Sequence, residues 1–183
     1  FMQTPTTPPS PFAVQGWPVL RLGFRPFYLV TALLACLSVP VWIAAFLGHI
    51  QLPLAQPLAP LLWHGHEMLF GFAAGVVAGF LLTAVKAWTG RQTPRGPLLA
   101  VLVLLWLAAR LAVFFAPYAV FAVIDMLLLP AVALALLRVL IQSGNKRNIP
   151  LISLLLLMAL ANGAFHLAVL GVLALPAVAA LSA

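Results

Sequence analysis

The chain has 183 residues, of which 65% are hydrophobic and 6% are charged. A soluble domain of this size carries far more charge, so the composition excludes an ordinary globular protein and indicates a multi-pass membrane protein. The net charge of +7 suggests nucleic-acid binding, but the basic residues lie beside loops between apolar segments, so we predict no nucleic-acid partner.

Five apolar segments are long enough to cross a lipid bilayer as helices, which takes about 20 residues each. We predict an all-α transmembrane bundle in one domain, residues 21–183, after a flexible cytoplasmic tail over residues 1–20 that is rich in Pro, Thr and Ser. Prolines separate the segments, because proline suits the first turn of a helix and interrupts its interior. The predicted spans are 27–47, 62–86, 97–116, 119–141 and 150–175.

The Lys and Arg residues gather on one side of the predicted membrane. Eight of the nine lie at or beside the segment before the first span and the loops after the second and fourth spans. The loops at 48–61 and 117–118 and the tail at 176–183 hold no Lys or Arg. By the positive-inside rule, the N-terminus is expected in the cytoplasm and the C-terminus outside.

Reporter fusions test this orientation. A reporter joined after residue 55 should give an external signal and one joined after residue 93 a cytoplasmic signal, because these positions fall in loops on opposite sides. The reverse pattern would show that the chain is inserted the other way.

All four histidines fall in the outer third of the predicted bilayer when depth is counted at about 1.5 Å per residue. They are His49, His64, His66 and His166. The same count places His166 roughly 6–9 Å deeper than His64, which disfavours both binding one iron directly.

The stretch Trp63-His64-Gly65-His66-Glu67-Met68 opens the second span. On a helical wheel at about 100° per residue, His64 and Glu67 share the face of Gly71 and Gly75, and His66 lies opposite. We therefore predict that His64 points into the bundle and His66 is freer. Gly71, Gly75 and Gly79 form a small-xxx-small ridge, which predicts close approach of another helix.

Two interpretations of these polar residues stay open. Imidazoles and carboxylates bind metals, so His64, His66, Glu67 and His166 are candidate ligands of a metal ion or haem. Alternatively, the motif caps a helix end at the wet interface, where a carboxylate is favourable. Asn162 and His166 share a face of the fifth span, where the amide either orients a metal-binding ring or joins an interhelical hydrogen bond.

Arg110 and Asp125 form a second polar pair. The third and fourth spans join at a tight turn near Pro117-Tyr118, and each residue lies seven positions from it, so an antiparallel hairpin puts both at one depth. Pairing avoids a cost of about 3 kcal/mol or more for each isolated charge. The pair is either a structural ion pair or an anion site in which Arg110 holds a propionate or substrate and Asp125 balances its charge.

The chain resembles the NnrS family of bacterial membrane proteins. The resemblance rests on four motifs and runs from about residue 20 to residue 175. These are Gly23-Phe24-Arg25-Pro26-Phe27-Tyr28, the stretch from Leu62 to Phe72, Ala78 to Val85 with Trp88-Thr89-Gly90, and Asn162 to His166.

The resemblance implies a haem- and copper-containing protein of the bacterial inner membrane, linked to nitric-oxide stress. It implies histidine ligands, which singles out His64, His66 and His166, with Asn162 beside the last. Family members are about twice as long, so the match covers the N-terminal half of the family pattern. We therefore expect either a piece of a longer protein or a half-length relative.

Three functions remain open from the sequence. The first is haem or copper binding in nitric-oxide tolerance. The second is a cofactor-free accessory subunit that packs against other membrane subunits of a respiratory or photosynthetic complex, using the glycine ridge. The third is a small-molecule transporter lined by the histidines and the Arg110–Asp125 pair. The sequence holds no nucleophile–base motif, P-loop or dinucleotide fingerprint, so an enzyme of those kinds is not favoured.

Overall fold

The computed structural model describes residues 17–174, and its regular structure in that range is entirely helical. Five helical segments are long and apolar enough to cross a membrane, which confirms the predicted all-α bundle. They are Phe24–Phe46, Pro60–Thr89, Pro97–Phe115, Tyr118–Ser143 and Lys146–Val169. Most of the predicted tail lies outside the described residues. Within its last part, Pro18–Leu20 form a short 3-10 turn, η1, whose Leu20 carbonyl accepts a hydrogen bond from the Gly96 amide.

Three of the five segments are single α-helices: α1 (Phe24–Phe46), α4 (Pro97–Phe115) and α5 (Tyr118–Ser143). The second is composite, with α2 (Pro60–His66), a π-helical segment η2 (Glu67–Ala73) and α3 (Ala74–Thr89). The last joins a 3-10 turn, η3 (Lys146–Asn148), to α6 (Pro150–Val169). Proline occupies the first turn of α2, α4 and α6, where its missing amide hydrogen costs nothing.

The predicted fifth span was too long, because α6 ends at Val169 rather than at residue 175. Gly171 has a φ of 74°, and this left-handed conformation lets the Val172 amide donate to the Leu167 carbonyl. Residues 170–174 are apolar but not helical, so hydrophobicity alone carried the prediction past the true end.

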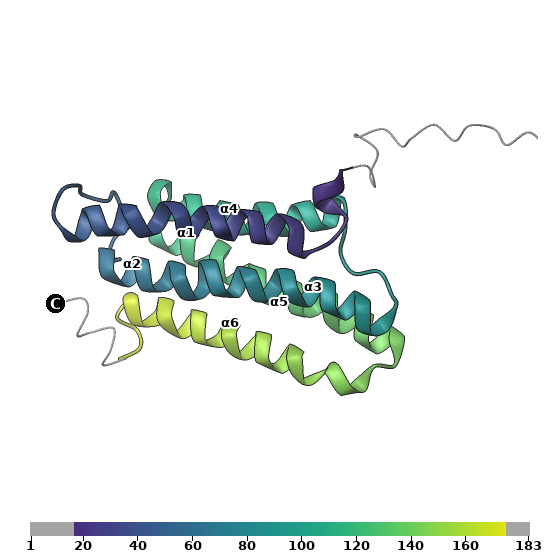
Figure 1. Ribbon diagram of the computed structural model, residues 1–183. Helices are drawn as coiled ribbons and strands as arrows, with labels where there is room; N and C mark the ends of the chain where they lie inside the picture. The colour runs from purple at the N-terminus through teal and green to yellow at the C-terminus, as the bar shows by residue number, and fades with distance from the viewer. Residues whose placement is uncertain (1–16, 175–183) are drawn as a thin grey trace, which may run out of the picture.

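α5 is the central helix of the bundle. It packs against α3, α4 and α6, while α1 packs mainly against α3 on the other side (Figure 1). The α4–α5 hairpin predicted from the short turn is therefore present, and it carries Arg110 and Asp125 on adjoining helices.

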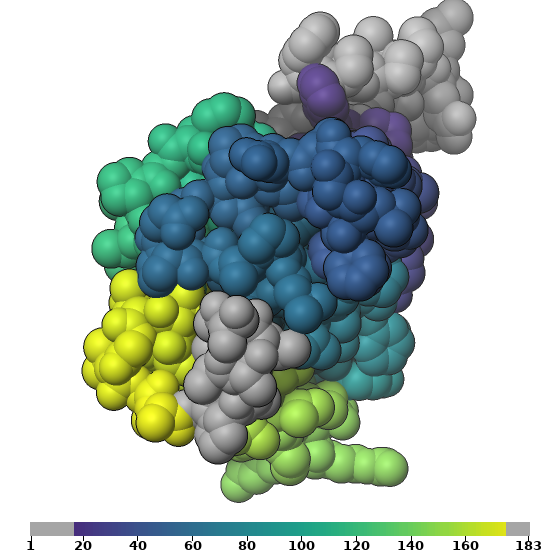
Figure 2. All heavy atoms as spheres, turned by 90° about the vertical axis from the view of Figure 1, so that its left-hand side faces the viewer, coloured from purple at the N-terminus to yellow at the C-terminus, as the bar shows by residue number. Residues whose placement is uncertain are grey.

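The segment between α1 and α2 covers one end of the bundle (Figure 2). Leu54 and Leu58 are buried there, and the Ala55 amide donates to the Val113 carbonyl at 2.8 Å. These leucines belong to an apolar cluster with Trp63, Phe121 and other residues. A larger apolar cluster fills the bundle toward its other end. Several buried polar side chains lie among the residues of these two clusters.

The glycine ridge is used inside the chain. A Cβ added at Gly75 would lie 2.5 Å from Thr31 Cγ2 of α1, and one added at Gly79 would lie 2.8 Å from Phe27 Cβ. The predicted close approach is thus made by α1 of the same chain. The ridge therefore gives no support to a docking surface for another subunit.

Candidate functional site: a buried polar cluster

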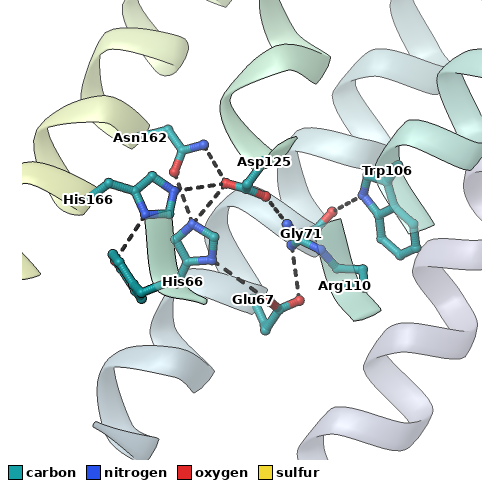
Figure 3. A network of polar contacts seen from close by, with 9 residues as sticks. His66, Glu67, Gly71, Trp106, Arg110, Asp125, Asn162 and His166 are labelled. Carbon is teal, nitrogen blue, oxygen red and sulfur yellow. Dashed lines mark hydrogen bonds and ion pairs between the residues drawn. The ribbon is translucent and has the colours of Figure 1, made fainter. Parts of the chain in front are cut away.

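Six polar side chains from four spans meet in the interior of the bundle (Figure 3). Each is at most 7% exposed. They are His66 and Glu67 of the second span, Arg110 of α4, Asp125 of α5, and Asn162 and His166 of α6. We call these six residues the polar cluster.

Arg110 binds both acidic residues of the chain. Its Nη1 donates to Glu67 Oε2 at 3.0 Å, and its Nη2 makes an ion pair with Asp125 Oδ1. The antiparallel hairpin predicts the contact with Asp125 but not the one with Glu67. Because both terminal nitrogens engage carboxylates, the arrangement favours a structural ion pair over an anion site.

Trp106 supports Arg110 from one turn earlier in α4. Its indole Nε1 donates to the Gly71 carbonyl at 3.0 Å, and the guanidinium carbon lies 5.6 Å from the centre of its ring. The spacing of four residues between Trp106 and Arg110 was the sequence signal for this contact, because such residues share a helix face.

Asp125 Oδ2 contacts the three remaining residues of the polar cluster. Asn162 Nδ2 donates to it at 2.7 Å, and the Nε2 atoms of His66 and His166 each lie 3.2 Å from it. His66 Nε2 also lies 2.9 Å from Asn162 Oδ1. The amide oxygen of Asn162 and the carboxylate oxygen of Asp125 can only accept hydrogen bonds. His66 must therefore carry its hydrogen on Nε2 in this arrangement.

His166 is held at its other nitrogen by Tyr118. With Nε2 donating to Asp125, His166 Nδ1 accepts from the Tyr118 hydroxyl at 3.0 Å. Tyr118 was not among the residues predicted from the sequence, because it is the first residue of α5 and its position gave no sign that it reaches α6.

Three atoms of the cluster are close enough to share one ion. His66, Asp125 and His166 are all buried, and their ligand atoms lie within 4.8 Å of one another. Asp125 had been considered only as the partner of Arg110. Glu67, a predicted ligand, instead faces Arg110 and the Nδ1 atom of His66, on the side of the ring away from Asp125.

The predicted burial of His64 and His66 was wrong. His66 is 1% exposed and lies inside the cluster, whereas His64 is half-buried and stacks on Trp42 of α1, with ring centroids 4.3 Å apart. The helical wheel placed the two histidines on opposite faces, and the structure agrees, because His64 and the glycine ridge both contact α1 whereas His66 contacts Asn162 of α6. The error was to treat the glycine face as the enclosed one, because α6 covers the opposite face and buries His66 there. His49 is exposed and lies outside the cluster.

The family model for NnrS proteins matches residues 18–183, which is most of the chain. The chain belongs to the NnrS family. No curated protein and no solved structure matched it in the comparisons.

The donor set of this NnrS protein suits a single metal ion. Two imidazoles and a carboxylate are common ligands of copper, zinc and iron ions. A haem does not fit between His66 and His166, because both Nε2 atoms face the same Asp125 oxygen. The rings of Phe121 and Phe165 also pack on His66, with centroids 5.7 and 4.8 Å away.

Proposed function

We propose that this NnrS protein is a membrane protein that binds one copper ion through His66, Asp125 and His166, and that this site serves nitric-oxide tolerance in the bacterial inner membrane. The observation that carries the proposal is the convergence of three buried ligand atoms from three separate spans. Buried ionisable groups in a bilayer are costly to keep, which argues for a functional reason to retain them.

The charge of the polar cluster also supports a bound cation. With Glu67 and Asp125 ionised, Arg110 protonated and both imidazoles neutral, the cluster carries one net negative charge. An unbalanced charge is expensive in a low-dielectric interior, so a cation among these residues is favoured.

The chain's own residues have separate roles in this proposal. His66, Asp125 and His166 bind the ion, and Asn162 holds the Asp125 carboxylate toward it. Arg110 fixes the other oxygen of Asp125, and the apolar clusters on both sides exclude water. A copper ion held by such ligands supplies one-electron redox chemistry and a binding position for a small diatomic molecule.

Metal content of histidine variants tests the proposal. The purified protein in detergent should bind one equivalent of Cu(I), measured by titration and elemental analysis. His66→Ala and His166→Ala should each abolish this binding, because two donors remain. The same variants should lose the ability to restore growth under a nitric-oxide donor to a strain that lacks the gene.

His49→Ala and His64→Ala are matched controls, since both remove an imidazole that lies outside the polar cluster. Both should bind Cu(I) like the wild type. Loss of binding in His64→Ala but not in His66→Ala would contradict the proposed ligand set. A haem absorption band that depends on His66 would contradict the choice of a single ion.

A further inference from the structure

Three buried polar atoms of the polar cluster have no hydrogen-bond partner among the described residues, and one of them is Arg110 Nε. The other two, His66 Nδ1 and Glu67 Oε1, lie 3.8 Å apart. Buried polar atoms are normally satisfied, so this open contact needs a physical explanation.

The tautomer of His66 supplies the explanation. A neutral imidazole carries one N–H, and His66 uses it on Nε2 toward Asn162 Oδ1 and Asp125 Oδ2. Nδ1 is then an acceptor, and so is the Glu67 carboxylate. Two acceptors cannot share a hydrogen bond, and 3.8 Å leaves no room for a water molecule between them.

A cation at Nε2 reverses this situation. A metal needs the lone pair of Nε2, so the single ring proton must reside on Nδ1, with no net gain or loss of protons by the ring. Nδ1–H is then a donor beside the acceptor Glu67 Oε1, and a shift that shortens the 3.8 Å separation to about 3 Å makes a hydrogen bond between the two unsatisfied atoms. Glu67 is itself fixed, because Arg110 Nη1 holds its other oxygen at 3.0 Å.

Resting on the proposed copper site, we infer that Glu67 is the positioning residue that turns His66 into a metal ligand. It does not touch the ion. Its Oε1 accepts the Nδ1 hydrogen in the metal-bound form and leaves Nε2 free to bind, as carboxylates commonly do behind metal-binding histidines. Tyr118 has the corresponding place behind His166.

The tautomer of His66 can be read directly by NMR of the whole chain with 15N-labelled histidine in detergent micelles. The metal-free protein should show the hydrogen of His66 on Nε2, and addition of Cu(I) should move it to Nδ1. The four histidines of the chain are assigned from single variants. A metal-free His66 with hydrogen on Nδ1, or on both nitrogens, would overturn the inference.

Glu67→Gln tests the role of the carboxylate. The new amide can donate to Nδ1 and so holds the hydrogen on Nε2, while its oxygen still accepts from Arg110. We expect the affinity for Cu(I) to fall by about 10- to 100-fold, the usual effect of removing such a partner. Glu67→Asp keeps the charge and should weaken binding less. Tyr118→Phe is the matched control. Any change of histidine tautomer in this variant should be confined to His166.

A purely structural Glu67 gives a different result. Its variants would lower the melting temperature, but the folded protein would bind Cu(I) with unchanged affinity and show the same His66 tautomers as the wild type. If the wild type bound no Cu(I), the proposed copper site would fall and this inference with it. If the wild type bound Cu(I) with the hydrogen of His66 on Nδ1 but Glu67→Gln bound it with unchanged affinity, only this inference would fail.

Discussion

Arg110→Leu should destabilise the bundle more than any other single substitution in the polar cluster, by about 3–5 kcal/mol or more in the free energy of unfolding. Among the described residues, Arg110 is the cation that pairs with both carboxylates, so its loss leaves Glu67 and Asp125 as two buried charges without this counter-charge. Thermal or SDS-induced unfolding in detergent micelles measures the effect.

Two comparisons separate charge from shape in that experiment. Arg138→Leu removes an exposed arginine of α5 and should change stability by no more than about 0.5 kcal/mol. The triple variant Arg110→Leu, Glu67→Gln, Asp125→Asn carries no charge in the cluster and should recover much of the lost stability. A triple variant as unstable as Arg110→Leu alone would mean that packing, rather than charge, causes the loss.

Gly75→Leu should cost about 3 kcal/mol of stability, near the upper end of the usual overpacking range. Even a Cβ at this position would lie 2.5 Å from Thr31 Cγ2 and 3.1 Å from Trp106 Nε1. A leucine would therefore push α1 away from α3 and displace the indole that supports Arg110. Unfolding in detergent, compared with the wild type, measures this cost.

Gly65→Leu is the matched control in the same composite span. Gly65 is exposed, and nothing lies within 4 Å of a Cβ added there. Because leucine favours a helix more than glycine does, this variant should be as stable as the wild type or slightly more stable. Equal losses at residues 65 and 75 would show that the glycine ridge does not set the distance between α1 and α3.

The sequence by itself determined the class of fold and one polar contact. Span number follows from the length of apolar segments and from the prolines and glycines between them, and these are local properties of the chain. The meeting of Arg110 and Asp125 follows from a short turn, because a tight antiparallel hairpin places equidistant residues at one depth.

Only the tertiary structure decided which histidine enters the polar cluster. The outcome depends on which helix covers each face of the second span, since α1 lies against the glycine ridge and His64 whereas α6 lies against His66. These contacts are remote in the chain, since His66 and Asn162 are separated by 96 residues. Helical periodicity describes a single helix at a fixed rotation per residue. It therefore assigns residues to faces but carries no information about which neighbouring helix covers each face.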